Sequence, residues 1–280
     1  MNWSNFIKNM KNLELTILGS GGAIPTPRPF CQCAVCVKAR EIGEPFKRNG
    51  SSLFINGINT VIDCGEDIAD SLNRRNVKQV DNIFVTHWHP DHTFGFRRIL
   101  DANYDFVSGK AERSINVYVP KNVFQVLEQK FPIIDHLINV KKTGKLHFIE
   151  DGDKIAVGNI TIEAVGYEGV NSSTYAYLIK KDNKKILYAP CDTIDFKRCK
   201  DFKDLDLFIS ECGVFVDCLG EISFEGVIER IQEIKPKRSI LTHIEEDDIR
   251  SMGEDYLQRM KEKYSGVDFD FAYDGMEILI

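Results

Sequence analysis

The sequence has no apolar run approaching the ~20 residues that a membrane-spanning helix needs, so it does not predict a helical membrane protein. Its first residues, Met1-Asn2-Trp3-Ser4-Asn5, contain no apolar core of a signal peptide. An excess of positive charge is also missing, because the formal net charge is −6. That charge gives no general attraction to nucleic acid or to anionic membranes. We therefore expect a cytoplasmic protein with neither membrane nor nucleic acid as its partner.

Histidine is scarce, with six residues among 280, whereas there are eight cysteines. In a reducing compartment cysteines are expected to be free thiols or metal ligands before disulfides. Hydrophobic residues make up 43% and charged residues 28% of the chain, as in ordinary globular proteins. No stretch has the composition of a linker, so we predict one domain over residues 1–280. The oligomeric state is left open, a homodimer included.

Three of the six histidines lie in the run His87-Trp88-His89-Pro90-Asp91-His92. The run follows the apolar stretch 82–86, which is typical of a strand that delivers a loop. Imidazole and carboxylate groups are the ligands of zinc, iron and manganese in proteins. A surface loop with chance histidines is the alternative, but this clustering favours a metal site. We expect His87 and His89 at one ion, with Asp91 and His92 at a second.

A second candidate metal site is Cys31-Gln32-Cys33-Ala34-Val35-Cys36, which places three thiols within six residues. This spacing predicts a structural zinc site near residues 31–36 that requires a fourth ligand from elsewhere. Unrelated buried thiols are the other interpretation.

Strand patterns recur along the chain, and two of them end in the same way. The stretch Ser239-Ile240-Leu241-Thr242-His243 repeats the earlier design of an apolar strand followed by Thr-His and a polar loop. Two such halves meeting edge to edge would bring both loops to one cleft, which supports a pseudo-symmetric sandwich. Near the end of the chain, residues 269–280 predict a β-hairpin around Asp274-Gly275.

The pattern His-x-His-x-Asp-His after a strand resembles the signature of metallo-β-lactamase-fold hydrolases. That resemblance implies a four-layer αββα sandwich with one or two metals at the sheet edge. It also implies that Asp63 orients the ligand loop, that Asp192 bridges the two metals and that His243 is a ligand. On local sequence alone, Asp63 and Asp192 could equally be turn residues.

The cysteine run narrows the resemblance to the phosphoribosyl cyclic phosphodiesterases of the carbon–phosphorus lyase pathway. In that branch a histidine three residues after the last catalytic histidine completes the cysteine site. Here Glu246 occupies this position. Because a carboxylate is a less typical zinc ligand beside three thiolates, the fourth ligand stays open between Glu246 and another residue.

The largest departure from the family is that no histidine occurs in residues 166–174, where a third histidine ligand is implied. Glu168 is the acidic residue of this stretch, and we take it as the candidate ligand; a solvated loop residue is the alternative. Replacing histidine by glutamate would favour harder ions such as manganese or magnesium. Glu221 is the candidate for protonating the leaving group, because it lies where the branch carries a histidine for that step.

The resemblance implies a phosphodiesterase that cleaves a small cyclic phosphodiester with a metal-bound hydroxide, using two divalent ions among zinc, manganese and iron. The implied catalytic residues are Asp91, Asp192 and Glu221. One alternative is a tRNA 3′-processing nuclease of the same fold, although no long basic insertion is visible. Another is a cofactor-biosynthesis protein like the cysteine-knuckle branch of the pyrroloquinoline quinone pathway, or a metal-binding module without catalysis.

Overall fold

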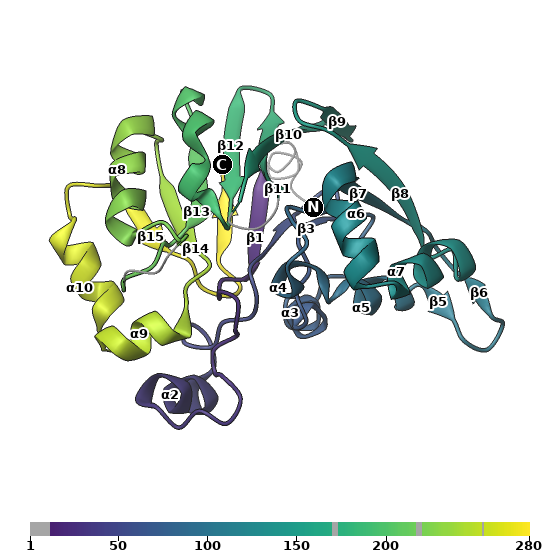
Figure 1. The fold of residues 1–280 in the computed structure, drawn as a ribbon, viewed down its shortest axis with the longest axis horizontal. Coiled ribbons are helices and arrows are strands. Elements are labelled where there is room, and N and C mark those ends of the chain that lie inside the picture. The colour runs from purple at the N-terminus through teal and green to yellow at the C-terminus, as the bar shows by residue number, and fades with distance from the viewer. Residues whose placement is uncertain (1–11, 170–172, 217–219, 254) are drawn as a thin grey trace, which may run out of the picture.

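The computed structural model describes residues 12–169, 173–216, 220–253 and 255–280. Two seven-stranded sheets pack face to face, and helices cover the outer face of each (Figure 1). This four-layer arrangement confirms the predicted αββα sandwich. Within the described residues, no helix combines the length and apolar character needed to cross a bilayer.

The first sheet is built from strands of both chain ends. In spatial order, its strands are β16 (Glu277–Leu279), β1 (Glu14–Gly19), β2 (Ser52–Ile55), β3 (Thr60–Ile62), β4 (Asn82–Phe84), β7 (Ile115–Pro120) and β8 (Gly144–Ile149). The helices and turns of this half are α3 (Ile68–Arg74), α4 (Pro90–Thr93), α5 (Phe96–Asp101), α6 (Lys121–Lys130), α7 (Ile133–Asp135) and η1 (His136–Val140). A small ribbon of β5 (Tyr104–Asp105) and β6 (Lys110–Ala111) extends from it.

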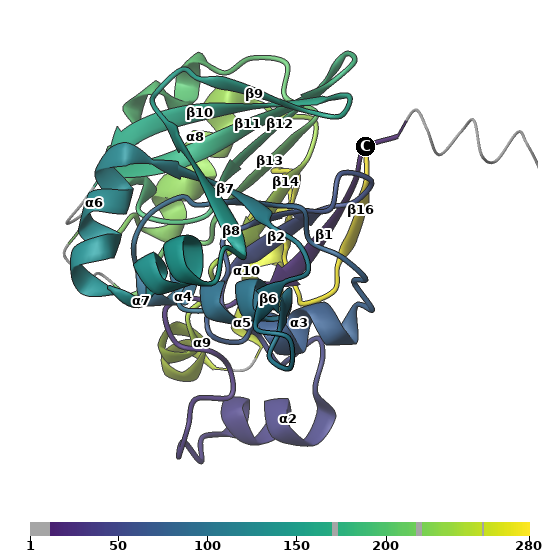
Figure 2. The same cartoon turned by 90° about the vertical axis from the view of Figure 1, so that its right-hand side faces the viewer.

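The second sheet comes from the C-terminal half. Its strands in spatial order are β15 (Phe269–Phe271), β14 (Ser239–Thr242), β13 (Leu207–Glu211), β12 (Lys184–Ala189), β11 (Ser173–Lys181), β10 (Ile160–Glu168) and β9 (Lys154–Val157). It is flanked by η2 (Thr193–Asp195), η3 (Lys197–Asp201), α8 (Phe224–Ile234), α9 (Glu246–Met252) and α10 (Tyr256–Lys263). Helix α2 (Ala34–Ile42) projects from the body of the molecule (Figures 1 and 2).

Apolar residues alternate along the second sheet and build two cores. Ile186 and Tyr188 face the first sheet, whereas the intervening Leu187 faces the helical layer. Such strands, buried on both faces, read as nearly continuous apolar runs. A hydrogen bond also joins the two sheets. Tyr177 of β11 donates its hydroxyl proton to Val85 O, just past β4, at 2.6 Å.

The predicted C-terminal hairpin is wrong, because β15 pairs with β14 and β16 pairs with β1 of the other sheet. The turn between β15 and β16 is held by hydrogen bonds at the place where the two sheets meet. The buried carboxylate of Asp274 accepts hydrogen bonds from the amide and hydroxyl of Ser20 and from the amide of Asn49. The chain therefore passes from one sheet to the other at this point instead of folding back on itself.

The segment after the histidine run forms two short helices, α4 and α5, with a break at Gly95. A Cβ atom there would lie 2.1 Å from Gly65 O, so the chain needs glycine at this close approach. The break sets α4, which carries Asp91 and His92, against the end of β3.

We predict that Tyr177→Phe lowers the free energy of unfolding by about 1–3 kcal/mol, because Val85 O loses its hydroxyl partner in a dry interface. Chemical denaturation of the purified variant measures this loss. Tyr188→Phe is the matched control, since its hydroxyl is buried without a hydrogen-bond partner among the described residues. That variant should be as stable as the wild type or more so; equal losses in both variants would contradict the assignment.

Candidate metal centre

The histidine loop is held by one buried carboxylate. Strands β3 and β4 run parallel and in register at Ile62 and Phe84, so the residues that follow them meet at one sheet edge. Asp63 Oδ1 accepts the amide of Thr86 at 2.8 Å, and Oδ2 accepts its hydroxyl at 2.7 Å. The same Oδ2 lies 2.8 Å from His92 Nδ1. Asp63 thus orients His92 with its Nε2 atom directed away, as the resemblance implied.

The tautomer of His87 follows from the same network. The hydroxyl of Thr86 has one proton, which it donates to Asp63, and so it accepts from His87 Nδ1 at 2.9 Å. Nε2 of His87 then carries a lone pair; it lies 2.9 Å from His89 Nδ1, and a bound cation would take the place of that contact. Burial and the neighbouring His92 and His89 lower the pKa of His87 well below its usual range. His87 is therefore neutral, which is the state a metal ligand requires.

The second half contributes the ends of β12 and β14. Asp192 and His243 follow these strands, and both adopt left-handed backbone conformations, with φ of 55° and 56°. Such conformations are uncommon outside glycine and are held only where the surroundings fix them. Here Tyr167 donates to Cys191 O at 2.6 Å, and the amide of Thr193 donates to the carboxylate of Glu211. The turn that carries Asp192 is thereby anchored on both sides.

The two halves converge on two groups of potential ligand atoms. Within each group, all atoms lie within 4.8 Å of one another: the first group is His87, His89, Cys191 and Asp192, and the second is His92, Cys191 and His243. Asp91 Oδ2 joins the second group, 3.1 Å from His92 Nε2 and 3.4 Å from His243 Nε2. Asp192 Oδ2 is buried without a hydrogen-bond partner among the described residues, and the group nearest to both His92 Nε2 and His243 Nε2 is the one carboxylate of Asp91. Because buried polar atoms are normally paired, these convergent atoms fit bound divalent cations.

Protons compete with a cation for the two histidines of the second group. Burial lowers the pKa of His92, but the charges of Asp91 and Asp63 outweigh it and raise that pKa to about 10. Burial likewise lowers the pKa of His243, but the hydrogen bond that its ring donates to Asp91 and the charge of Glu245 outweigh burial and raise that pKa to about 9. Both imidazoles hold protons where no metal is bound, so a metal would have to displace them.

The structure brings together His87, His89, Asp91, His92, Asp192 and His243, and Glu221 lines the same cleft. It does not bring Glu168 to the centre. Glu168 is the last residue of β10, has an exposed side chain and lies outside both ligand groups. The neighbouring Asn171 falls outside the described residues. Sequence reasoning missed Cys191, and its adjacency to Asp192 was the one available signal.

The cysteine run lies at the start of α2 and meets α9. The Sγ atoms of Cys31, Cys33 and Cys36 lie 3.8, 3.2 and 3.3 Å from Glu246 Oε1. Glu246 is fully buried, and Arg28 Nε lies 3.1 Å from its Oε2. Burial raises the pKa of the Cys36 thiol to about 12, so this group would lose its proton on binding a metal. Three thiols and one carboxylate could hold a tetrahedral zinc ion, with Glu246 as the fourth ligand.

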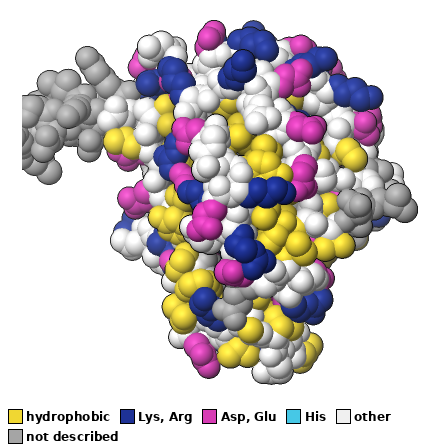
Figure 3. All heavy atoms as spheres, turned by 90° about the vertical axis from the view of Figure 1, so that its left-hand side faces the viewer, with side chains coloured by type: hydrophobic (Ala, Val, Ile, Leu, Met, Phe, Trp, Pro, Cys, Tyr) yellow, Lys and Arg dark blue, Asp and Glu magenta, His cyan; other side chains and the backbone are white. Residues whose placement is uncertain are grey.

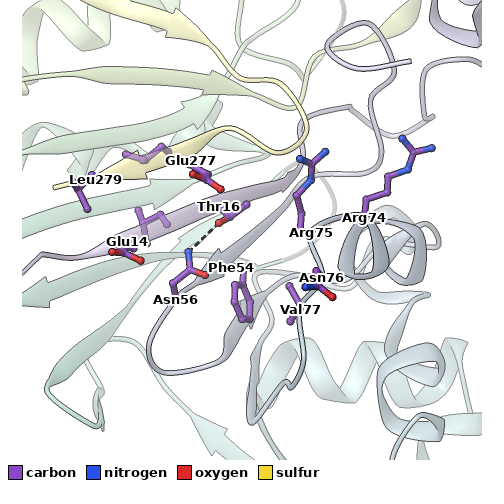
Figure 4. Close-up of a pocket in the computed structure, with 12 residues that line it drawn as sticks. Glu14, Thr16, Phe54, Asn56, Arg74, Arg75, Asn76, Val77, Glu277 and Leu279 are labelled. Carbon is purple, nitrogen blue, oxygen red and sulfur yellow. Dashed lines mark hydrogen bonds between the residues drawn. The ribbon is translucent and has the colours of Figure 1, made fainter. Parts of the chain in front are cut away.

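Two large clefts differ in their chemistry. A cleft of about 640 Å³ beside β1 and β16 contains Arg74 and Arg75 (Figure 4). Both arginines pair with Glu44. This cleft holds none of the grouped ligands. A cleft of about 690 Å³ is lined by His89, Asp91, Cys191, Asp192 and His243. We therefore assign the functional site to the second cleft.

A family model described as the β-lactamase superfamily domain matches residues 59–244. The chain belongs to this superfamily. The matched segment begins at the end of the β2–β3 turn and extends past β14, so it contains every residue of the two active-site ligand groups. The cysteine run lies outside it.

Among curated proteins, the chain is similar to ribonuclease Z of Clostridium tetani, with 32% identity over 129 residues, or 45% of this chain and 34% of that protein. It is 25% identical to ribonuclease Z of Picrophilus torridus over 190 residues, or 67% of this chain and 54% of that protein. The chain thus spans about a third to a half of these relatives.

Among solved structures, the chain resembles a diphosphatase of the PhnP family, with 20% identity, a TM-score of 0.75 and coverage of 95% of this chain and 97% of that one. It also resembles Zn²⁺-bound PqqB from Methylobacterium extorquens, with 16% identity, a TM-score of 0.77 and coverage of 95% and 99%. At these identities the likeness shows the shared fold and not the substrate.

We predict that Glu246→Gln lowers the metal content of purified protein by about one ion per chain and lowers its melting temperature, because the amide cannot supply the negative charge of the fourth ligand. Elemental analysis and thermal unfolding measure both effects. Asp247→Asn is the matched control, since this half-exposed neighbour pairs with Arg28 and Arg250 and lies outside the ligand group of the three cysteines and Glu246. A Glu246 variant with the metal content of the control would contradict the prediction.

Proposed function

We propose that this protein is a metal-dependent phosphodiesterase that cleaves a small cyclic phosphodiester. The observation that carries the proposal is the convergence of both ligand groups on one cleft of about 690 Å³. Bound divalent ions would supply an activated water and neutralise a phosphoryl group there. The volume falls in the range of small-molecule sites, which supports a small substrate.

The charge of the cleft supports a metal requirement. Two arginines line it, Arg28 and Arg250, and both pair with Asp247. The lining carboxylates outnumber them: Asp91, Asp192, Glu211, Glu221, Glu245, Asp247 and Asp248. A phosphodiester anion would be repelled by this surface, so cations held by the ligand groups must neutralise it before such a substrate binds.

Asp91 and Asp192 would act by binding and orienting, and Glu221 by moving a proton. Glu221 lines the cleft and lies just before α8 in the chain. Burial, together with the charges of Glu211 and Asp192, raises the pKa of its carboxyl group to about 7. A carboxylic acid that is still protonated near neutral pH can donate a proton to a leaving alkoxide.

A ribonuclease Z-type activity is the second candidate, since the curated relatives are ribonuclease Z proteins. Such an enzyme needs a basic surface for RNA. On the face over α8, α9 and α10, acidic and basic side chains are interspersed, which does not favour that activity there (Figure 3). Cleavage of a tRNA precursor by the purified protein, with a steep salt dependence, would favour it.

The proposal predicts that purified protein loaded with zinc, manganese or iron hydrolyses cyclic phosphates and aryl phosphodiesters, and that a chelator abolishes turnover. His89→Ala and Asp192→Ala should each lower kcat by at least about 100-fold, because each removes a ligand, without changing the circular dichroism spectrum. Asp195→Ala, an exposed acid on η2, should retain wild-type rates. Wild-type rates in either ligand variant, or no turnover with any of these ions, would overturn the proposal.

The proposed role of Glu221 implies a pH dependence. With its pKa raised to about 7, Glu221 is protonated below that pH and loses the proton above it. If it is the proton donor, kcat falls as pH rises through about 7. Glu221→Gln should lower kcat and remove this alkaline decline, and a pH–rate profile measures both. The control Glu229→Gln, at an exposed position on α8, should keep the wild-type profile; a decline that persists in Glu221→Gln would refute the role.

A further inference from the structure

The family pattern implies a third histidine in the first ligand group, and this chain lacks it. A residue at the end of a different strand could take its place. No histidine occurs in residues 166–174. In place of a ligand, the end of β10 carries Tyr167, whose side chain packs against Phe196 and whose hydroxyl donates to Cys191 O at 2.6 Å. The end of β10, which carries no histidine, therefore holds Cys191, another potential ligand, in position.

Cys191 is the residue shared by both groups. Its Sγ atom lies within 4.8 Å of the ligand atoms of His87, His89 and Asp192, and also of those of His92 and His243. The residue is 5% exposed and lines the functional cleft. We propose that the Cys191 thiolate is a metal ligand of the active centre, completing the first position in place of the missing histidine. This inference rests on the metal-binding part of the proposed function.

The backbone around Cys191 is fixed before any metal binds. Besides the bond from Tyr167, the Thr193 amide donates to Glu211 Oε1 at 2.5 Å, and Arg230 donates to Thr193 O at 2.8 Å. Independent of the thiol, the buried Oδ2 atom of Asp192, which has no hydrogen-bond partner among the described residues, points to a cation at the same place. A thiol on a fixed turn beside unpaired lone pairs is preorganised for ligation.

A Cys191 ligand at the first position changes which metal we expect there. With Glu168 as third ligand, the first position would favour manganese or magnesium. A thiolate is soft, so a set of two imidazoles, one carboxylate and one thiolate favours zinc or cobalt over those ions. Binding breaks the Sγ–H bond, and the proton leaves to solvent as the sulfur donates its electron pair to the metal.

Cobalt-substituted protein tests the proposal by absorption, because thiolate–cobalt bonds give a charge-transfer band in the near ultraviolet. Cys31, Cys33 and Cys36 contribute to this band as well, so each variant is compared with wild type. Cys191→Ala should lose intensity on the order of one thiolate in four, as three more belong to the cysteine run. The control Cys199→Ala, an equally buried thiol outside both groups, should keep the full band.

A second measurement does not depend on the folding of any variant. In wild-type protein, alkylation followed by peptide mass mapping should show Cys191 protected when zinc is bound and modified after chelation. Cys199 should react equally in both states. Unchanged reactivity of Cys191, or a full cobalt band in Cys191→Ala, would overturn the inference.

The two proposals fail in different ways. If His89→Ala loses cobalt while Cys191→Ala retains both cobalt and the full band, the metal centre stands and Cys191 is not its ligand. If wild-type protein binds metal solely at the cysteine run, the proposed function and this inference both fail.

Discussion

The site depends on the hydrogen bonds that the carboxylate of Asp63 accepts. This carboxylate is fully buried, and its hydrogen bonds join the end of β3 to the loop after β4 and to His92. Asp63 itself has a left-handed backbone, with φ of 62°, like Asp192 and His243. Each such conformation costs on the order of 1–3 kcal/mol and persists only when its surroundings determine it. The strand ends are thus held in strained shapes that direct side chains into one cleft.

The two halves are brought to this cleft by close backbone contact. The amide of Gly22 donates to Ile244 O at 3.2 Å, and the hydroxyls of Ser51 and Thr242 lie 3.0 Å apart. A Cβ atom on Gly19 would lie 1.9 Å from Gly50 O, so the last position of β1 requires glycine. In the turn that follows, Ser20 and Gly22 exchange backbone hydrogen bonds with Ile244, which holds the residue after His243 against this turn.

Much of this could be predicted where the signal is local. The apolar runs before His87 and His243 predict strands that end in ligand loops, and both do so. The C-terminal hairpin was wrong because the burial of Asp274 between the sheets depends on distant Ser20 and Asn49. Cys191 was missed for the same reason: its place depends on Tyr167 and on two histidine loops, and no spacing rule links these segments.

The acidic residues around the centre affect both the protonation of its histidines and its affinity for cations. Asp91, Asp63 and Glu245 are the groups whose charges raise the pKa values of His92 and His243. The same negative field attracts divalent cations, so protons and metals compete for one set of lone pairs. Because lowering the pH adds protons to this competition, the site should hold its metals less tightly in acid than at neutral pH. A thiolate from Cys191 would strengthen this coupling, since it too must give up a proton before it can bind.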